Sequence, residues 1–289
     1  MHLATSFSRQ RSWYTLLVGM LLVLTLLLAG CGGASTQTTS TTKAGVTPPN
    51  NLMIPGSLSV GSELTYPPKE FVNTATGQPT GFDIDLITAM AERMGLKTNI
   101  VSTRFDTIID DLNNKRFDVV ISGMHVTPAR EQKVDFVEYA RSGESLLVSK
   151  GNPENIKTYS DLCGKKIGVQ GGTLQQDRLN AASKACTTKG KAGIQLTVLT
   201  SQSEVVNLLV NKRVDATLQV DAVSSYYLKQ NPGILDVGSS IVNTSVEGIA
   251  VRKGDASMKT AIQKALAAVK TDGTYKKLLD KWGLAGEAI

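Results

Sequence analysis

The sequence predicts an α/β fold, and two observations lead to that prediction. Segments with the character of strands alternate with segments of helical periodicity along most of the 289 residues. Glycines directly follow several predicted strands, where the turn into the next helix begins. Such alternation is typical of α/β proteins with parallel sheets, and open sheets of this kind bind ligands outside the carboxyl ends of their strands.

The first half of the chain contains two clear elements of this pattern. Phe82–Met94 is predicted to be a helix, because its apolar residues recur at helical spacing and Gly95 suits its end. Phe117–Ser122 is an apolar run with adjacent valines, as expected of a buried parallel strand. Thr127 followed by Pro128 marks the start of the next helix. Between the helix that ends at Met94 and the strand that begins at Phe117, we expect a strand over 98–102 and a helix over 105–113.

The second half repeats the alternation. Strands are expected over 166–170, 197–199, 214–220 and 247–252. Helices are expected to begin at Gly171-Gly172-Thr173, at the capping box of Ser201 and Glu204, at Asp221 and at Asp255. A last helix is expected over 275–282, after the break at Thr271-Asp272-Gly273.

The N-terminus has the layout of a secretory signal. Arg9 and Arg11 precede an apolar run over 15–29, which is shorter than the roughly 20 residues needed to cross a bilayer. Small residues and Cys31 follow this run. The alternatives are an uncleaved membrane anchor and an ordinary signal whose cysteine is accidental. Under each interpretation, the chain after Cys31 lies outside the cytoplasm.

Residues 32–56 are predicted to form a disordered Ser/Thr-rich tether. The stretch is rich in Ser, Thr, Gly and Pro, carries one charge and has almost nothing to bury. Such a composition does not offset the entropy of ordering. The body that follows, from about Leu58 to Ile289, is long enough for one large or two small domains.

The composition argues against several classes of function. The net charge of +6 falls to about +4 after Cys31, and the charges are interspersed, so no nucleic-acid partner is expected. His125 is the one histidine after Cys31, which excludes a multi-histidine metal site. A Ser-His-Asp or Cys-His site would have to use His125, and no G-x-S-x-G pattern accompanies it. We expect no catalytic residue, no metal and no cofactor.

Cys163 and Cys186 lie 23 positions apart and are the only other cysteines. In an oxidising compartment they are expected to form a disulfide. The alternative is two buried free thiols. A zinc site is disfavoured, because no CxxC pair or histidine cluster accompanies the two cysteines.

Three turns at the ends of predicted strands could bind a ligand. In the turn from Ser122 to Arg130, Gly123 permits a close approach and the helix start attracts anions. Arg130 could grip a carboxylate bidentately there, or it could be a solvated surface residue. The second turn, Gln170 to Leu174, lacks the phosphate-loop pattern. In the third, Gln219-Val220-Asp221, the aspartate could pair with an ammonium group or could cap a helix.

These turns, in this order, resemble the family 3 solute-binding proteins, which are the substrate-binding lipoproteins of polar amino-acid ABC importers. The resemblance covers nearly the whole body. It rests on Gly81–Leu86, Ser122–Arg130 with Val134-Asp135-Phe136, Gly164–Thr173, Arg213–Ala216, and Asp272–Tyr275 with Lys281-Trp282. Leu28-Ala29-Gly30-Cys31 likewise resembles the bacterial lipobox, which implies that Cys31 is lipidated after cleavage of a signal peptide over 1–31.

The resemblance implies a two-lobed periplasmic-binding-protein-like fold of type II, with two hinge strands and the ligand between the lobes. The first lobe would comprise 57–141 and 248–289, and the second 142–247. The crossings would lie near Ser142-Gly143-Glu144 and Ser245-Val246-Glu247. Closure around the ligand would present a new surface to the permease.

The resemblance also implies roles for individual residues. Arg130 would bind the α-carboxylate of an amino acid, assisted by the turn that contains Ser122, by the backbone of Gly123 and His125, and by the helix start at Thr173 and Leu174. Tyr66 and Phe105 would wall the pocket, while Glu63 and Gln170 would contact the amino group or side chain. The expected partners are an amino acid, an ABC permease and, through Cys31, the membrane. The expected state is an extracytoplasmic monomer.

One position departs from the family pattern. The family usually places its ammonium-binding aspartate directly after the residue aligned with Gln219, but here Val220 stands there and Asp221 follows. A shift of one residue on a strand reverses the face of the side chain. Asp221 could still reach the ligand from a bulged strand end, Glu63 could replace it, or the ligand could lack an α-amino group.

Other functions remain open on the sequence. Some proteins that resemble this chain dehydrate cyclohexadienyl acids, a reaction that needs an acid/base pair, with Glu63, Asp221 or His125 as candidates. Others carry a peptidoglycan-cleaving domain, which is disfavoured because no such domain follows Ile289. A third alternative is a ligand receptor for a separate sensor. We expect a binding protein that is not an enzyme.

Overall fold

The computed structural model describes residues 45–239 and 244–289. The signal peptide, Cys31 and the first part of the expected tether lie outside the described residues. The described residues belong to one compact unit that begins at Thr42. Within them, no helix combines the length and the apolar character needed to span a membrane.

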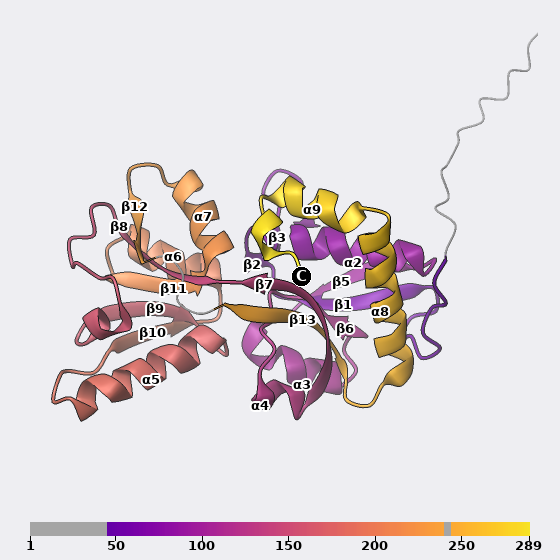
Figure 1. The fold of residues 1–289 in the computed structure, drawn as a ribbon, viewed down its shortest axis with the longest axis horizontal. Coiled ribbons are helices and arrows are strands. Elements are labelled where there is room, and N and C mark those ends of the chain that lie inside the picture. The colour runs from indigo at the N-terminus through magenta and orange to yellow at the C-terminus, as the bar shows by residue number, and fades with distance from the viewer. Residues whose placement is uncertain (1–44, 240–243) are drawn as a thin grey trace, which may run out of the picture. The chain divides into compact units, whose positions relative to one another are not determined.

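Five strands form the first sheet, in the order β5-β1-β6-β13-β7. Their bounds are β1 (Ser57–Ser62), β5 (Lys97–Ser102), β6 (Val119–Val120), β7 (Val134–Ser142) and β13 (Ser245–Arg252). The helices of this part of the chain are α2 (Phe82–Arg93), α3 (Ile108–Asn113), α8 (Ala256–Thr271) and α9 (Thr274–Trp282). Apolar residues of α2, α8 and the sheet form the largest core cluster, and Figure 1 shows these two helices side by side.

Five further strands form the second sheet, in the order β10-β9-β11-β8-β12. Their bounds are β8 (Glu144–Ser149), β9 (Lys166–Gln170), β10 (Gln195–Leu199), β11 (Ala216–Val220) and β12 (Leu235–Ser239). The helices of this part are α5 (Leu174–Thr188), α6 (Gln202–Val210) and α7 (Asp221–Gln230). The second sheet has core clusters of its own, which indicates that each sheet organises a separate hydrophobic core.

Short elements complete the structure. A small antiparallel sheet contains β2 (Thr65–Tyr66), β3 (Glu70–Val72) and β4 (Pro79–Thr80), which we did not predict. The helix expected over 105–113 is divided into the 3-10 turn η1 (Phe105–Thr107) and α3. The other short helices are α4 (Pro128–Glu131), η2 (Tyr159–Leu162) and η3 (Ala285–Glu287).

Both sheets are mixed, whereas the alternation of elements predicted parallel sheets. β1 pairs in parallel with β5 and β6, but β13 runs antiparallel to β6 and β7. In the second sheet, β8 runs antiparallel to β11 and β12. Only Gly143 separates β7 from β8, so the chain passes directly from one sheet into the other. Strands that enter a sheet without a crossover helix are free to pair in antiparallel fashion.

Most of the predicted helix starts are confirmed by their caps. Thr127, Ser201 and Asp255 each accept a hydrogen bond from a backbone N–H in the first turn of the helix they precede. Thr173 caps α5 in the same way, through the N–H of Gln176. The helix expected at Asp221 also begins there, but Asp221 is its first helical residue and Val220 is the cap, so the role of Asp221 as a cap was predicted wrongly.

The C-terminal part of the expected tether is ordered, which corrects its predicted boundary at residue 56. The backbone N–H groups of Gly45 and Val46 donate to the carbonyl oxygen of Arg93 at the end of α2. Further along, the N–H of Met53 donates to Asp118 Oδ1, at 3.0 Å. The segment satisfies its backbone groups on the first sheet and its helices, so composition alone misjudged it.

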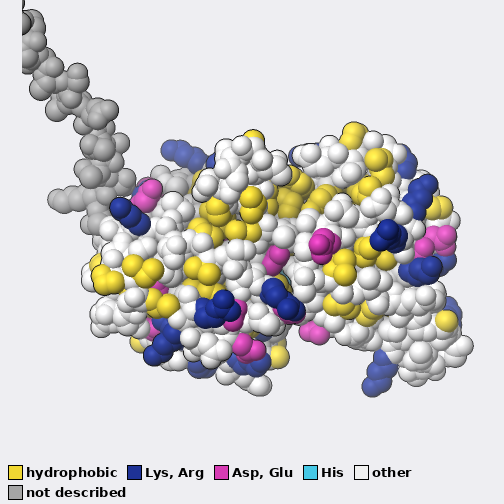
Figure 2. All heavy atoms as spheres, turned by 180° about the vertical axis from the view of Figure 1, so that it is seen from behind, with side chains coloured by type: hydrophobic (Ala, Val, Ile, Leu, Met, Phe, Trp, Pro, Cys, Tyr) yellow, Lys and Arg dark blue, Asp and Glu magenta, His cyan; other side chains and the backbone are white. Residues whose placement is uncertain are grey.

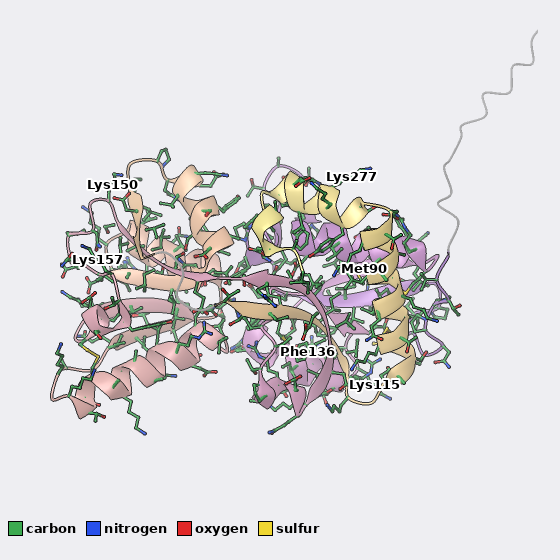
Figure 3. The ribbon with its side chains drawn as sticks, in the orientation of Figure 1. Met90, Lys115, Phe136, Lys150, Lys157 and Lys277 are labelled. Atoms are coloured by element: carbon green, nitrogen blue, oxygen red, sulfur yellow. A yellow bond between two sulfur atoms is a disulfide. The ribbon has the colours of Figure 1, made fainter. Side chains whose placement is uncertain are left out.

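Cys163 and Cys186 form a disulfide with a Cα–Cα distance of 5.6 Å, as predicted from their spacing. The bond links the end of η2 to α5, and Figure 3 shows it as a yellow bond beside that helix. Both cysteines pack with the core cluster of the second sheet. On the face seen in Figure 2, cationic and anionic side chains are interspersed, as in the sequence.

Candidate functional site

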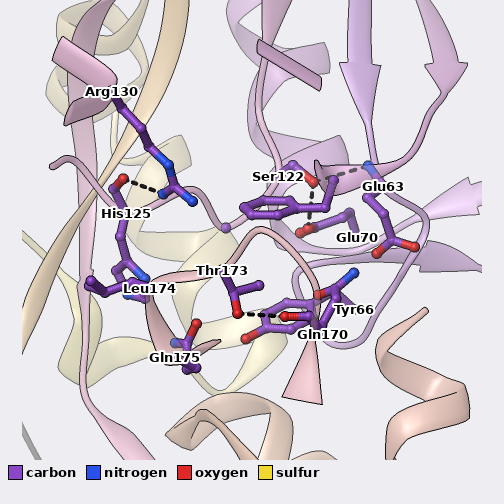
Figure 4. Close-up of a pocket in the computed structure, with 12 residues that line it drawn as sticks. Glu63, Tyr66, Glu70, Ser122, His125, Arg130, Gln170, Thr173, Leu174 and Gln175 are labelled. Carbon is purple, nitrogen blue, oxygen red and sulfur yellow. Dashed lines mark hydrogen bonds between the residues drawn. The ribbon is translucent and has the colours of Figure 1, made fainter. Parts of the chain in front are cut away.

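Residues from both sheets meet around one cavity, which Figure 4 shows in close-up. Ten residues that the sequence singled out line it: Glu63, Tyr66, Phe105, Ser122, Gly123, His125, Arg130, Gln170, Thr173 and Leu174. Glu70 and Gln175 also line it, and the sequence analysis missed both. The cavity volume is about 10 Å³, which is room for about one water molecule.

The turns at the carboxyl ends of strands explain why these residues converge. Glu63 directly follows β1, and Ser122 follows β6 by two residues. Gln170 ends β9, and the backbone then turns into α5 at Thr173. Strands that run in parallel bring such turns to the same edge of a sheet. The two sheets present these edges to the same cavity.

Arg130 occupies the turn after β6 and lies in α4. Its Nη1 donates to the carbonyl oxygen of His125 at 2.6 Å, and its Nη2 donates to that of Gly172 at 2.9 Å. The guanidinium carbon lies 5.4 Å from the centre of the Phe105 ring. Burial lowers the pKa of Arg130 to about 10, so the group stays charged at neutral pH. These contacts hold a partly buried cation at one end of the cavity.

The start of α5 adds to this positive end. Thr173 caps the helix, and Leu174 and Gln175 in its first turn line the cavity. The N-terminus of a helix of this length favours negative charge. Nε2 of Gln175 is buried and has no hydrogen-bond partner among the described residues. An anionic group beside Arg130 would therefore meet both the helix start and the Gln175 amide.

Two carboxyl groups lie at the other end of the cavity in the view of Figure 4. Glu63 accepts from Thr65 Oγ1 at 2.7 Å, and Glu70 Oε1 accepts from Ser122 Oγ at 3.0 Å. Burial raises the pKa of Glu63, and it raises the pKa of Glu70 well above the ordinary range, helped by nearby acids. The cavity thus has a cationic end and an acidic end.

His125 connects the cavity to the strands that cross between the sheets. Its Nε2 lies 3.1 Å from Ser142 Oγ on β7, and Ser142 donates to Glu247 Oε1 on β13 at 2.6 Å. Burial lowers the pKa of His125 to about 4, so its imidazole is neutral at physiological pH. His125 therefore lines the cavity as a neutral, hydrogen-bonded side chain.

A buried ion cluster lies behind His125. Lys69 Nζ is 2.7 Å from Glu247 Oε2, and it also pairs with Glu287 of η3. Lys69 and Glu247 are fully buried. Burial alone would lower the pKa of Lys69, but the two carboxylates raise it above its ordinary value. The pairing fixes the C-terminal segment against the crossing strand β13.

The two parts of the chain touch directly around the cavity. The backbone N–H of Gln202 donates to Thr65 Oγ1 at 3.0 Å. Gly172 packs so closely that a Cβ there would lie 2.7 Å from Asp106 Cα, and its φ of +75° also favours glycine. Since the cavity holds about one water molecule, a larger molecule enters only when these contacts separate.

Asp221 does not join the other predicted site residues. It lines a different cavity, together with Arg141 of β7 and Trp282 of α9. β11 continues to Val220, which is buried, and the backbone N–H of Asp221 donates to the carbonyl oxygen of Gly143. Because successive residues of a strand face opposite sides, the one-residue shift turns Asp221 away from Arg130.

No group of three or more His, Cys, Asp or Glu side chains within 45–239 and 244–289 has an arrangement that could hold a metal ion. Cys31, the expected lipidation site, lies outside these residues.

Comparison with known proteins places the chain among binding proteins. Residues 58–285 match the model of the bacterial extracellular solute-binding proteins, family 3. The ABC transporter arginine-binding protein 1 of Escherichia coli (strain K12) is 31% identical over 229 residues, covering 78% of this chain and 90% of that protein.

Solved structures agree with this family model. An ancestral arginine-binding protein bound to arginine is 38% identical, with a TM-score of 0.74, covering 78% of this chain and 98% of that one. An ancestral amino acid-binding protein described as a precursor of cyclohexadienyl dehydratase is 35% identical, with a TM-score of 0.71 and coverages of 78% and 95%. The chain therefore belongs to the family 3 bacterial extracellular solute-binding proteins.

Proposed function

We propose that this protein captures an amino acid in the cavity around Arg130 and delivers it to the permease of an ABC importer. The observation that carries the proposal is the partly buried Arg130 guanidinium, held by the carbonyl oxygens of His125 and Gly172 next to the start of α5. A guanidinium fork in this position matches a carboxylate. The relative from Escherichia coli is named as an arginine-binding protein of an ABC transporter, which supports the proposal.

The lobes of the proposed receptor are 57–141 with 248–289, and 142–247. The crossings near Ser142-Gly143-Glu144 and Ser245-Val246-Glu247 would act as hinges, and the described structure would represent a closed form. Opening would separate Gly172 from Asp106 and admit the ligand. Reclosure would bring Arg130 onto the carboxylate, with Tyr66 and Phe105 as walls and Gln170 and Glu63 near the remaining polar groups.

The protein would act outside the cytoplasm as a monomer, anchored to the membrane through a lipid on Cys31. Such an anchor would keep the ligand-loaded form close to the permease. We propose a role in binding rather than in catalysis, although a relative is described as a precursor of a dehydratase. His125 is held by Ser142 and is neutral, and these properties suit a wall residue.

A thermal-shift screen tests the proposal. The full chain, in detergent, would be stripped of bound ligand by unfolding and refolding, and then mixed with amino acids, polyamines and dicarboxylates. A ligand that binds the folded state raises its stability by mass action. We expect one or a few amino acids to raise the melting temperature. A response only to compounds without an α-amino group, or to no amino acid at all, would contradict the proposal.

A further inference from the structure

Glu70 is the buried acid of the cavity whose hydrogen bonds are incomplete. It begins β3, in the small sheet that the sequence did not predict, and is 1% exposed. Its Oε1 accepts a hydrogen bond from Ser122 Oγ. Its Oε2 is buried and has no hydrogen-bond partner within the described part of the chain. Figure 4 shows its carboxyl group near Ser122 and on the same side as Glu63.

A buried carboxyl oxygen without a partner is costly, because the group has lost its water and gained nothing in exchange. Most buried polar atoms in folded proteins are satisfied, so an exception in a binding cavity points to a missing ligand group. In its charged form a carboxylate can only accept, so the group that would complete the hydrogen bonds of that form is a donor. The cavity gives Glu70 access to such a group.

The charges around Glu70 indicate that this donor is cationic. The acids that act on it come from three elements: Asp83 of α2, Glu63 after β1, and Glu247 of β13. The nearby cation Lys69 is paired with Glu247 and Glu287. Arg130 bonds to backbone carbonyl oxygens, and the pKa of His125 is about 4. Among residues 45–239 and 244–289, the acidic end therefore offers no positive partner for Glu70.

We propose that Glu70 is a specificity-determining residue that receives a positively charged side chain of the ligand, so that the protein prefers cationic amino acids. The proposal rests on the function proposed above, in which Arg130 takes the carboxylate. Oε2 of Glu70 accepts from the side-chain cation, and Glu63 supplies a second negative charge beside it. A ligand with a carboxylate at one end and a cation at the other matches both ends of the cavity.

Binding of such a ligand releases protons. Burial and the neighbouring acids raise the pKa of Glu70 well above its ordinary range, so this carboxyl group holds a proton more tightly than a solvated one does. A cation that arrives beside the carboxylate favours its charged form and displaces the proton. A neutral ligand has no such effect.

The test compares charged ligands with uncharged counterparts of similar shape, using isothermal titration calorimetry of the full chain in detergent. Arginine is paired with citrulline, and lysine with norleucine. Glu70→Gln retains an acceptor for Ser122 but removes the charge, so it separates charge from positioning. We expect the better cationic ligand to bind Glu70→Gln at least about tenfold more weakly, with its neutral counterpart changed by less than about threefold. Asp221→Asn, an acid of the second cavity, serves as the matched control and is expected to leave both affinities unchanged.

Equal losses for charged and neutral ligands would assign Glu70 to positioning Ser122 and would overturn the proposal. No loss in Glu70→Gln would overturn it as well. Should this variant fail to fold, the wild-type chain still decides: titrations in two buffers of different ionisation enthalpy should show proton release with the cationic ligand and none with its counterpart. Preference of the wild type for a neutral amino acid would contradict the role of Glu70 but leave Arg130 and the receptor intact. Binding of no amino acid would refute both proposals.

Discussion

Two cavities lie on opposite sides of the strands that join the sheets, and they differ in size and in charge. The cavity around Arg130 has a volume of about 10 Å³, whereas the second, between α7, α9 and β7, has about 510 Å³. Two adjacent residues of β7 point to different cavities, as expected of successive residues in a strand. Ser142 bonds to His125 at the first cavity, and Arg141 lines the second. In Figure 1, α7 and α9 lie on one side of β7, and α4 and α5 lie on the other.

The two cavities differ in how well their buried polar groups are paired. The second cavity contains charged residues, but its Glu287 is paired with Lys69, and its Asp221 is only half-buried and bonds to Ser145. The small cavity instead holds Glu70 and Gln175, each with a buried polar atom that has no partner among the described residues. This difference supports the small cavity as the proposed binding site, although the second cavity is larger.

The largest expected effect comes from removing the arginine of each cavity. Arg130→Ala should weaken amino-acid binding by at least about a hundredfold, because a buried guanidinium–carboxylate pair contributes several kcal/mol. Arg141→Ala, its counterpart in the second cavity, should change the affinity by less than about twofold. Isothermal titration calorimetry on both variants measures the contrast. Similar losses of affinity in the two variants would contradict the assignment of the ligand to the cavity around Arg130.

A smaller effect is expected from blocking closure. A Cβ at Gly172 would lie 2.7 Å from Asp106 Cα, so Gly172→Ala should destabilise the closed form and weaken binding by about tenfold. Gly151→Ala controls for the backbone, because Gly151 has a similar φ of +78° with no atom within 4 Å of its added Cβ. Each substitution should cost roughly 1–2 kcal/mol of stability through its left-handed backbone.

Calorimetry and thermal unfolding of the two glycine variants separate the contributions. Only Gly172→Ala should lower ligand affinity, whereas both should lower the melting temperature. Unchanged affinity in Gly172→Ala would mean that the contact with Asp106 is not part of the bound form.

The pH dependence of ligand binding tests the roles of Glu63 and Glu70 in the cavity around Arg130. The pKa values of Glu63 and Glu70 are raised by burial, so protons compete with a cationic ligand. Affinity for such a ligand should therefore rise severalfold from about pH 5 to about pH 8, as the acids lose their protons. His125, with a pKa of about 4, stays neutral over this range and contributes no change. Calorimetry in matched buffers measures this dependence. An affinity that falls as the pH rises would contradict the prediction.

The smallest expected effect belongs to Asp221. Its side chain lines the second cavity, so Asp221→Asn should leave ligand affinity within about twofold of the wild type. A fluorescence or calorimetric titration is sufficient to measure this. A loss of more than about tenfold would show that α7 turns Asp221 toward the ligand in the bound form.

The sequence predicted much of the cavity because its residues follow local rules. Arg130, Gly123 and Thr173 lie at strand-to-helix turns, and the ends of parallel strands meet at a common edge. Gly172 was expected at the start of a helix, and the structure packs it against Asp106. Such positions can be found from strand patterns, glycines and capping residues alone.

The surroundings of Glu70 and the direction of the Asp221 side chain could not be predicted from local sequence patterns. Glu70 comes directly after Pro67-Pro68-Lys69 and begins the three-residue strand β3. Neither periodicity nor a capping pattern indicates a buried acid at this position. Its hydrogen-bond partner Ser122 and the acid Asp83, which raises its pKa, are both distant in sequence. Asp221 carried a suitable side chain, but its direction depends on where β11 ends and α7 begins. The ion cluster of Lys69, Glu247 and Glu287 likewise joins three distant segments.

A crystal structure of the chain with the amino acid that gives the largest thermal shift tests the central claim most directly. We predict that the carboxylate of the ligand lies against Arg130 and the start of α5, with its other end toward Glu63 and Glu70. The second cavity, beside Arg141, should hold no amino acid. A ligand bound beside Arg141, or one whose carboxylate lies away from Arg130, would contradict the account.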